Sequence, residues 1–93
     1  MFQISLERTF APNREALVRD VDREAVLLDL EAGTYFGLNS VGARIWHLLE
    51  HDGRLRAVFD ALCGEYEAAP DEIECDLLAL VTRLVEARLG ELR

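Results

Sequence analysis

The chain has 93 residues, about half of them apolar, and its 18 acidic residues outweigh 10 basic ones, all arginine, to give a net charge of -8. This length suits one globular domain, so we expect a single domain over residues 1–93. The negative charge disfavours a nucleic-acid partner. No apolar run approaches the roughly 20 residues that cross a bilayer, and the N-terminus lacks signal-peptide features, so we expect a cytoplasmic protein with no membrane partner.

Three segments rich in β-forming residues come before the first helical pattern. The first two, residues 16–21 and 24–30, are separated only by residues 22–23, which predicts an antiparallel hairpin. A turn at residues 31–33, which contains a glycine, leads into a third strand of only five residues, 34–38. The pattern therefore predicts a small antiparallel sheet whose last strand is short.

The N-terminal segment, residues 1–13, precedes these strands. Phe2, Ile4 and Leu6 alternate with polar residues, as in a half-buried strand. We therefore expect this segment to be either an extra strand of the sheet or a mobile arm.

Helical periodicity replaces the strand pattern at Asn39-Ser40, which can cap the first helix. We predict this helix over residues 40–51, ended by Asp52-Gly53, and a second helix over residues 54–66. Together with a third helix, described next, the chain predicts an α+β, winged-helix-like fold in which a small antiparallel three-stranded sheet is followed by three helices.

The third helix is predicted over residues 71–89, with Asp71 as N-cap, Glu74 completing a capping-box-like pair, and Gly90 ending it. Its apolar positions cover about half of the circumference, more than one core contact requires. They are Ile73, Leu77, Leu78, Leu80, Val81, Leu84, Val85 and Leu89. Either two other elements of the fold cover this wide face, or part of it lines a groove beside a sheet edge.

The two cysteines and a run of acids complete the second half of the chain. Cys63 and Cys75 form no CxxC pair, and we expect both to be buried structural thiols. The acidic residues between positions 60 and 76 have no basic residue among them. They indicate either a solvated loop with acids at a helix N-terminus or a surface that attracts a basic peptide or enzyme.

His47, Glu50 and His51 form an HxxEH pattern, which inverted zinc proteases use to bind zinc. A catalytic zinc also needs a third protein ligand and a walled cleft, for which a chain of this length has little room. The two histidines also lie opposite the apolar stripe of their helix. We therefore expect a solvated pair of histidines, no metal, no cofactor and no catalytic activity, with a small zinc hydrolase as the enzymatic alternative.

A winged-helix architecture can also serve DNA binding through a basic helix. Here the exposed positions of the third helix carry four acids, Glu72, Glu74, Asp76 and Glu86, against two arginines. We expect such a fold to have another use, although an acidic winged-helix transcription regulator stays as an alternative.

Four short motifs follow one another along the chain: Leu38-Asn39, Val41-Gly42-Ala43, Asp52-Gly53 and Leu89-Gly90. With this order and spacing, residues 16–92 resemble the PqqD-like family. The resemblance implies a RiPP recognition element, a fold of three strands and three helices that binds the leader of a ribosomally made precursor peptide. In that family the leader adds as an antiparallel strand to the edge of the third strand and lies against the third helix.

A groove between the short strand and the wide helix face would account for both features. Main-chain hydrogen bonds would supply affinity and side-chain pockets selectivity. The resemblance assigns the peptide site to Thr34, Tyr35, Phe36, Gly37, Leu38, Asp76, Leu77, Leu80, Val81 and Leu84. Which of Tyr35 and Phe36 faces the groove stays open, because a one-residue shift in register exchanges them. Pairing of residues 1–13 with the outer edge of the third strand would count against the site.

Within the family, the chain looks most like the stand-alone recognition proteins of lasso peptide clusters. Their leaders carry a Tyr and a Pro that occupy apolar pockets. The partners implied are a precursor leader peptide, a leader peptidase and a macrolactam-forming cyclase, with the protein itself a monomer or weak dimer. The alternative within the family is a peptide chaperone of pyrroloquinoline quinone biosynthesis.

Overall fold

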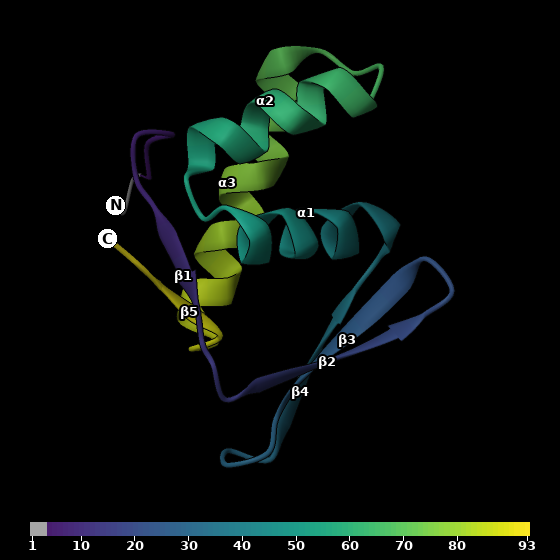
Figure 1. Cartoon of the computed structure of the whole chain (residues 1–93), viewed down its shortest axis with the longest axis vertical. Helices are drawn as coiled ribbons and strands as arrows, with labels where there is room; N and C mark the ends of the chain where they lie inside the picture. Colours follow the sequence, from purple (N-terminus) through teal and green to yellow (C-terminus); the bar gives the residue numbers. More distant parts are fainter. Residues whose placement is uncertain (1–3) are drawn as a thin grey trace.

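The structure, a computed structural model, describes residues 4–93 of the chain. Its elements, in chain order, are β1 (Phe10–Pro12), β2 (Ala16–Val21), β3 (Glu24–Asp29), β4 (Thr34–Leu38), α1 (Ser40–His51), α2 (Leu55–Glu65), α3 (Pro70–Glu86) and β5 (Gly90–Leu92). The order β2 to α3 confirms the predicted α+β fold, with a three-stranded antiparallel sheet followed by three helices (Figure 1). Within residues 4–93, no helix combines the length and the apolar character that a membrane span requires.

The three-stranded sheet has the order β2-β3-β4, with β3 in the centre. Asp22, at a φ of 58°, makes the tight turn between β2 and β3, and Gly33, at a φ of 72°, makes the turn into β4. Because both connections are short, all neighbouring strands are antiparallel and β4 is an edge strand. Within residues 4–93, the outer side of β4 has no paired strand.

The register of β4 settles which aromatic residue faces the helices. Phe36 pairs with Leu27, which is fully buried, so Phe36 lies on the helix side and is half-buried. Tyr35 is 78% exposed on the opposite face of the sheet. The two faces thus differ, because the helices cover one and leave the other to solvent (Figure 1).

The first helix begins and ends as the sequence predicts. The side chain of Asn39 accepts a hydrogen bond from the Gly42 N–H at 2.8 Å, which satisfies one of the unpaired donors at the start of α1. The helix then buries Trp46 and Leu49 in the core against the inner face of the sheet. The end of β4 is therefore fixed directly to the start of α1.

The third helix differs from its predicted limits at both ends. It begins at Pro70 with Ala69 as N-cap, so the assignment of Asp71 as N-cap was wrong. Proline is suited to the first helical position because that residue needs no N–H partner, and it places Asp71 inside the first turn, where an acid favours the helix dipole.

At its other end α3 stops at Glu86, three residues earlier than predicted. The N–H of Leu89 donates to the Leu84 carbonyl at 2.9 Å, and the N–H of Arg88 donates to the Val85 carbonyl at 3.0 Å. These two bonds, with Arg88 at a φ of 61°, form a Schellman motif in which arginine takes the position that glycine usually holds. Gly90 consequently starts β5 and does not end the helix.

The two ends of the chain form a second sheet. Phe10–Pro12 pairs antiparallel with Gly90–Leu92, and Thr9 and Arg93 exchange backbone hydrogen bonds of 3.1 and 2.8 Å. Phe10 is only 1% exposed and meets Trp46 edge to face, with 6.2 Å between ring centroids. The described part of the N-terminal segment therefore binds the C-terminal strand and leaves the edge of β4 open.

Some predictions for individual side chains were wrong. Ile4 and Leu6 are buried as expected but form no strand, because the chain turns at this point, and Phe2 lies outside the described residues. Cys63 is half-buried against the core, whereas Cys75 is exposed on α3 and is not a buried thiol. Helical position decides the difference, since Cys75 falls outside the apolar stripe.

Candidate peptide-binding groove

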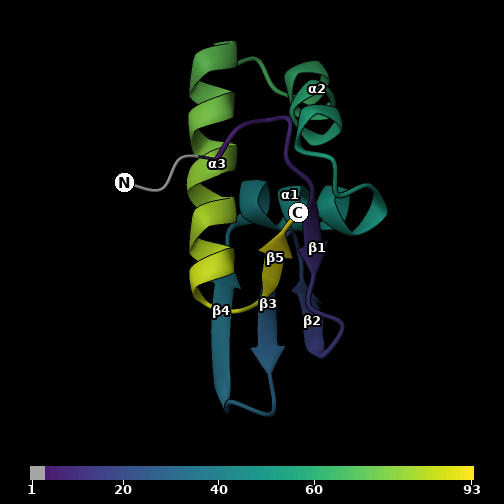
Figure 2. The same ribbon diagram turned by 90° about the vertical axis from the view of Figure 1, so that its left-hand side faces the viewer.

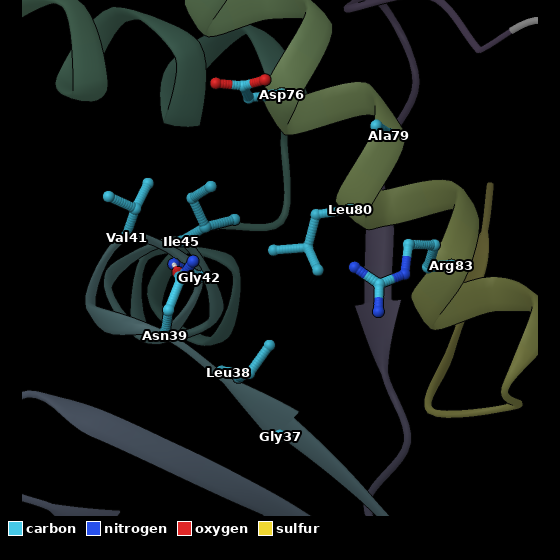
Figure 3. Close-up of a pocket in the computed structure, with 10 residues that line it drawn as sticks. All are labelled: Gly37, Leu38, Asn39, Val41, Gly42, Ile45, Asp76, Ala79, Leu80 and Arg83. Carbon is cyan, nitrogen blue, oxygen red and sulfur yellow. Dashed lines mark hydrogen bonds between the residues drawn. The ribbon is translucent and has the colours of Figure 1, made fainter.

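A hollow of about 410 Å³ lies where the end of β4, the start of α1 and the middle of α3 meet (Figure 3). Figure 2 shows β4 on the same side of the molecule as α3, so the hollow opens beside the unpaired edge of the sheet. It is lined by Gly37, Leu38, Asn39, Val41, Gly42, Ile45, Asp76, Ala79, Leu80 and Arg83. We call this hollow the β4–α3 groove.

Small residues keep the walls of the groove close together. A Cβ atom on Gly42 would lie 3.3 Å from Cδ2 of Leu38, so glycine allows α1 to start close to the end of β4. Val41, the next residue back, is 39% exposed and presents its methyl groups to the groove. Leu80, at 9% exposure, reaches the floor from α3 (Figure 3). The surface is thus apolar at its centre and open on one side.

A smaller hollow of about 160 Å³ lies near the other end of β4. It is formed by Thr34, Tyr35 and Phe36 together with Leu27 and the residues after α3, Ala87 and Leu89. Two hollows therefore lie along one five-residue edge strand. The larger lies between β4 and α3, and the smaller lies between β4 and the residues that follow α3. An extended segment placed along the edge would meet both.

The structure divides the ten residues assigned to the peptide site into accessible and buried groups. Thr34, Tyr35, Gly37 and Asp76 are exposed, Phe36 is half-buried, and Leu38 and Leu80 are mostly buried but line the groove. In contrast, Leu77, Val81 and Leu84 have 0% exposure, so they have no surface to offer a peptide in this structure. Most of the wide apolar face of α3 is therefore covered by the fold itself.

Several residues of the groove were missed from the sequence. The α1 wall, Val41, Gly42 and Ile45, was not assigned to the peptide site, and Ala79 and Arg83 fall between the apolar positions of α3. The Asn39 cap carried the relevant signal, since it joins β4 directly to α1 and so brings the first turn of that helix to the strand edge.

The groove carries one charge of each sign on α3. Asp76 lies at one end and Arg83 two helical turns later (Figure 3). The guanidinium carbon of Arg83 lies 5.0 Å from the centroid of the Phe36 ring, a cation–π contact that joins α3 to β4. The polar groups thus stand at the margins of an apolar centre, an arrangement typical of ligand sites.

In the HxxEH segment, His47 links α1 to the sheet. His47 Nε2 lies 2.9 Å from Asp20 Oδ1 on β2, and its Nδ1 lies 3.3 Å from Glu50 Oε1. The hydrogen bond with Asp20, and more weakly that with Glu50, raises the pKa of His47 above its usual value. The expected solvated pair is therefore half right, since His51 is exposed but His47 joins the sheet to α1. In the part of the chain that the structure describes, no three His, Cys, Asp or Glu side chains are grouped to hold a metal.

The chain is similar to several known proteins. A family model described as coenzyme PQQ synthesis protein D (PqqD) matches residues 24–89, within the span of the resemblance noted above. A solved structure described as TbiB1 in complex with the TbiA(beta) leader peptide is similar, at 40% identity and a TM-score of 0.82 over 87% of this chain and 94% of that one.

A second solved structure, lasso peptide synthetase B1 complexed with the leader peptide, shares 34% identity at a TM-score of 0.79, over 89% of this chain and 98% of that one. Among curated proteins, none matches this chain. Because the family model covers more than two thirds of the sequence, from the centre of the sheet to the end of α3, the chain belongs to the PqqD family.

Proposed function

We propose that this protein binds the leader segment of a ribosomally synthesised precursor peptide of the lasso type, by adding it as an antiparallel strand to β4. The observation that carries the proposal is the unpaired edge of β4 beside the β4–α3 groove. The two similar structures, each solved with a leader peptide, support it. The protein acts without covalent chemistry.

The edge strand explains affinity and the groove explains selectivity. An edge strand presents unpaired N–H and C=O groups that any extended peptide can use. Side chains of the peptide that point toward the helices would contact Phe36, Val41 and Leu80, with Asp76 and Arg83 at the margins. Leu77, Val81 and Leu84 would contribute indirectly, because their packing in the core fixes the position of α3 relative to β4.

Capture of the leader serves enzymes that act on the rest of the precursor. By holding the leader, the protein raises the effective concentration of the core peptide at a leader peptidase and a macrolactam-forming cyclase. This assigns it the role of a cytoplasmic adaptor between a substrate and two separate enzymes.

A second candidate is the peptide chaperone of pyrroloquinoline quinone biosynthesis. The description of the matching family model favours it. Both candidates use the same edge and the same groove, so they differ in which precursor peptide binds.

The test is a fluorescence anisotropy titration of a labelled lasso-type leader that contains a Tyr-x-x-Pro pattern. We expect saturable binding that is lost when the Tyr and Pro are both replaced by Ala. Binding of the quinone-precursor peptide in place of any lasso-type leader would favour the second candidate. Binding of neither would contradict peptide capture as the function.

A further inference from the structure

We propose that Arg83 is the residue that selects an acidic side chain in the bound leader and so fixes the register of the added strand. The inference rests on the function proposed above and names a chemical requirement on the peptide. It begins from the position of Arg83, whose side chain extends from α3 beside Leu80 at the margin of the β4–α3 groove (Figure 3).

The contact with Phe36 leaves the hydrogen-bonding groups of Arg83 available. A guanidinium in a cation–π contact interacts with the ring through its charge, and the contact uses none of its five N–H groups as hydrogen-bond donors to an acceptor atom. Within residues 4–93, the Arg83 side chain has no hydrogen bond and no ion pair. Residues 1–3, Met-Phe-Gln, carry no acidic side chain, so they supply no carboxylate for an ion pair with Arg83.

Four other arginines are engaged by carboxylates, namely Arg44, Arg54, Arg56 and Arg93. Arg44 forms a bidentate pair with Glu65 at 2.8 and 2.7 Å, and Arg54 binds Asp52 at 2.7 Å. Carboxylates outnumber arginines in this chain, yet the arginine that lines the groove is held by an aromatic ring. The ring orients the guanidinium in advance, which lowers the entropy cost of binding a carboxylate from outside.

Strand addition needs a residue of this kind. Main-chain hydrogen bonds are the same for every register, and a slip of one residue turns every side chain to the opposite face. A bidentate pair between Arg83 and one carboxylate of the peptide has a fixed geometry and penalises such a slip.

Asp76 adds direction to this selection. It lies on the same helix seven residues before Arg83, which corresponds to two turns or about 10 Å. A peptide carboxylate is therefore attracted at one end of the groove and repelled at the other, so a leader bound in the reverse direction loses the favourable contact.

The experiment is a positional scan of the leader used above, in which each residue in turn is replaced by Glu, Gln or Lys. Affinities are measured for the wild-type protein and for Arg83→Gln and Arg83→Glu. The matched control is Arg19→Gln, which removes the same charge from the opposite face of the sheet, where Arg19 pairs with Val26. Thermal unfolding of all four proteins checks that the fold is kept.

The net charge of -8 favours Lys over Glu at most positions, so the informative site is one where this order is reversed. We expect one position at which Glu binds wild-type protein about tenfold more tightly than Lys. The preference should vanish in Arg83→Gln, reverse in Arg83→Glu and persist in Arg19→Gln.

The outcomes separate the two proposals. If the parent leader binds but no position loses a Glu preference in Arg83→Gln, the role of Arg83 is overturned while strand addition stands. If Arg19→Gln abolishes the preference equally, the effect belongs to the overall charge and the role of Arg83 is again overturned. If the parent leader binds no form of the protein, the proposed function itself fails.

Discussion

The two short strands at the chain ends, β1 and β5, pair with each other, whereas the edge strand β4 leaves the backbone groups on its outer side without a paired strand within residues 4–93. Around β1 and β5 the packing is closed: a Cβ atom at Gly90 would lie 2.0 Å from Cζ of Phe10, and one at Gly53 would lie 2.0 Å from the Phe10 carbonyl oxygen. At Gly37 in β4, nothing lies within 4 Å of the same atom. The chain fills one region completely and leaves the other open.

This difference shows why the edge of β4 is available. The N-terminal segment could have paired with β4, but Phe10 is buried against Trp46 and its strand is paired with β5. Closing the termini on each other thus keeps residues 10–12 from pairing with β4. Stability and binding are thereby assigned to different strands, and they can be changed separately.

The largest effect should come from the closed region. Gly90→Ala should lower the free energy of unfolding by about 3 kcal/mol, because the added methyl group collides with a ring that has no room to move. Urea denaturation measures the change. Gly64→Ala is the matched control: Gly64 lies near the end of α2 with nothing within 4 Å, and alanine there should add about 0.5 kcal/mol. Equal effects of the two changes would contradict the closed packing.

A charge on the groove wall should affect binding and spare stability. Val41→Asp should weaken leader binding about tenfold, since a carboxylate replaces an apolar contact. The fold should hold, because an acid in the first turn of α1 favours the helix dipole. Anisotropy titration gives the affinity. Val21→Asp, on an exposed strand position away from the groove, should bind as wild type; a similar loss there would show that charge alone is responsible.

The ion pair of His47 should give stability a dependence on pH. Because the folded protein raises the pKa of His47, protonated His47 stabilises the fold fully below about pH 6.5. That contribution is lost as pH rises through the raised pKa. The Tm advantage of wild type over His47→Gln should therefore shrink with increasing pH, and it should be small, since His47 and Asp20 are 39% and 57% exposed. An advantage that grows with pH would rule out this role.

The smallest effect tests the two faces of β4. Tyr35→Ala should change leader affinity less than about twofold, because Tyr35 lies on the face away from the helices. Phe36→Ala should weaken it severalfold, since it removes both a wall of the smaller hollow and the aromatic support of Arg83. The reverse ranking in side-by-side titrations would place the peptide on the other face of the sheet.

Local signals were sufficient to predict the central sheet and the first helix. The hairpin at Asp22, the glycine turn before β4 and the Asn39 cap each depend on neighbouring residues, and each was found from the sequence. The strands β1 and β5 have only three residues each and pair across the whole chain, so no periodicity could show them.

The candidate site was predicted in outline only. Periodicity identified the apolar face of α3 but could not separate Leu77, which is fully buried, from Leu80, which reaches the groove. That division depends on where α1 and the sheet lie against α3, which is a tertiary property. Arg83 was missed because a charged residue at a helix surface has no distinguishing pattern until the ring beneath it is known.

The open edge of β4 has a further consequence for the protein when no peptide is present. An unpaired strand is a template for a second copy of itself as much as for a leader, and such pairing leads to aggregation. Here the exposed strand is five residues long, and each molecule carries a charge of -8 that repels its neighbours. Salt weakens this repulsion, so the peptide-free protein should become less soluble as salt rises. A bound leader should keep the protein soluble, because it pairs with the open edge of β4.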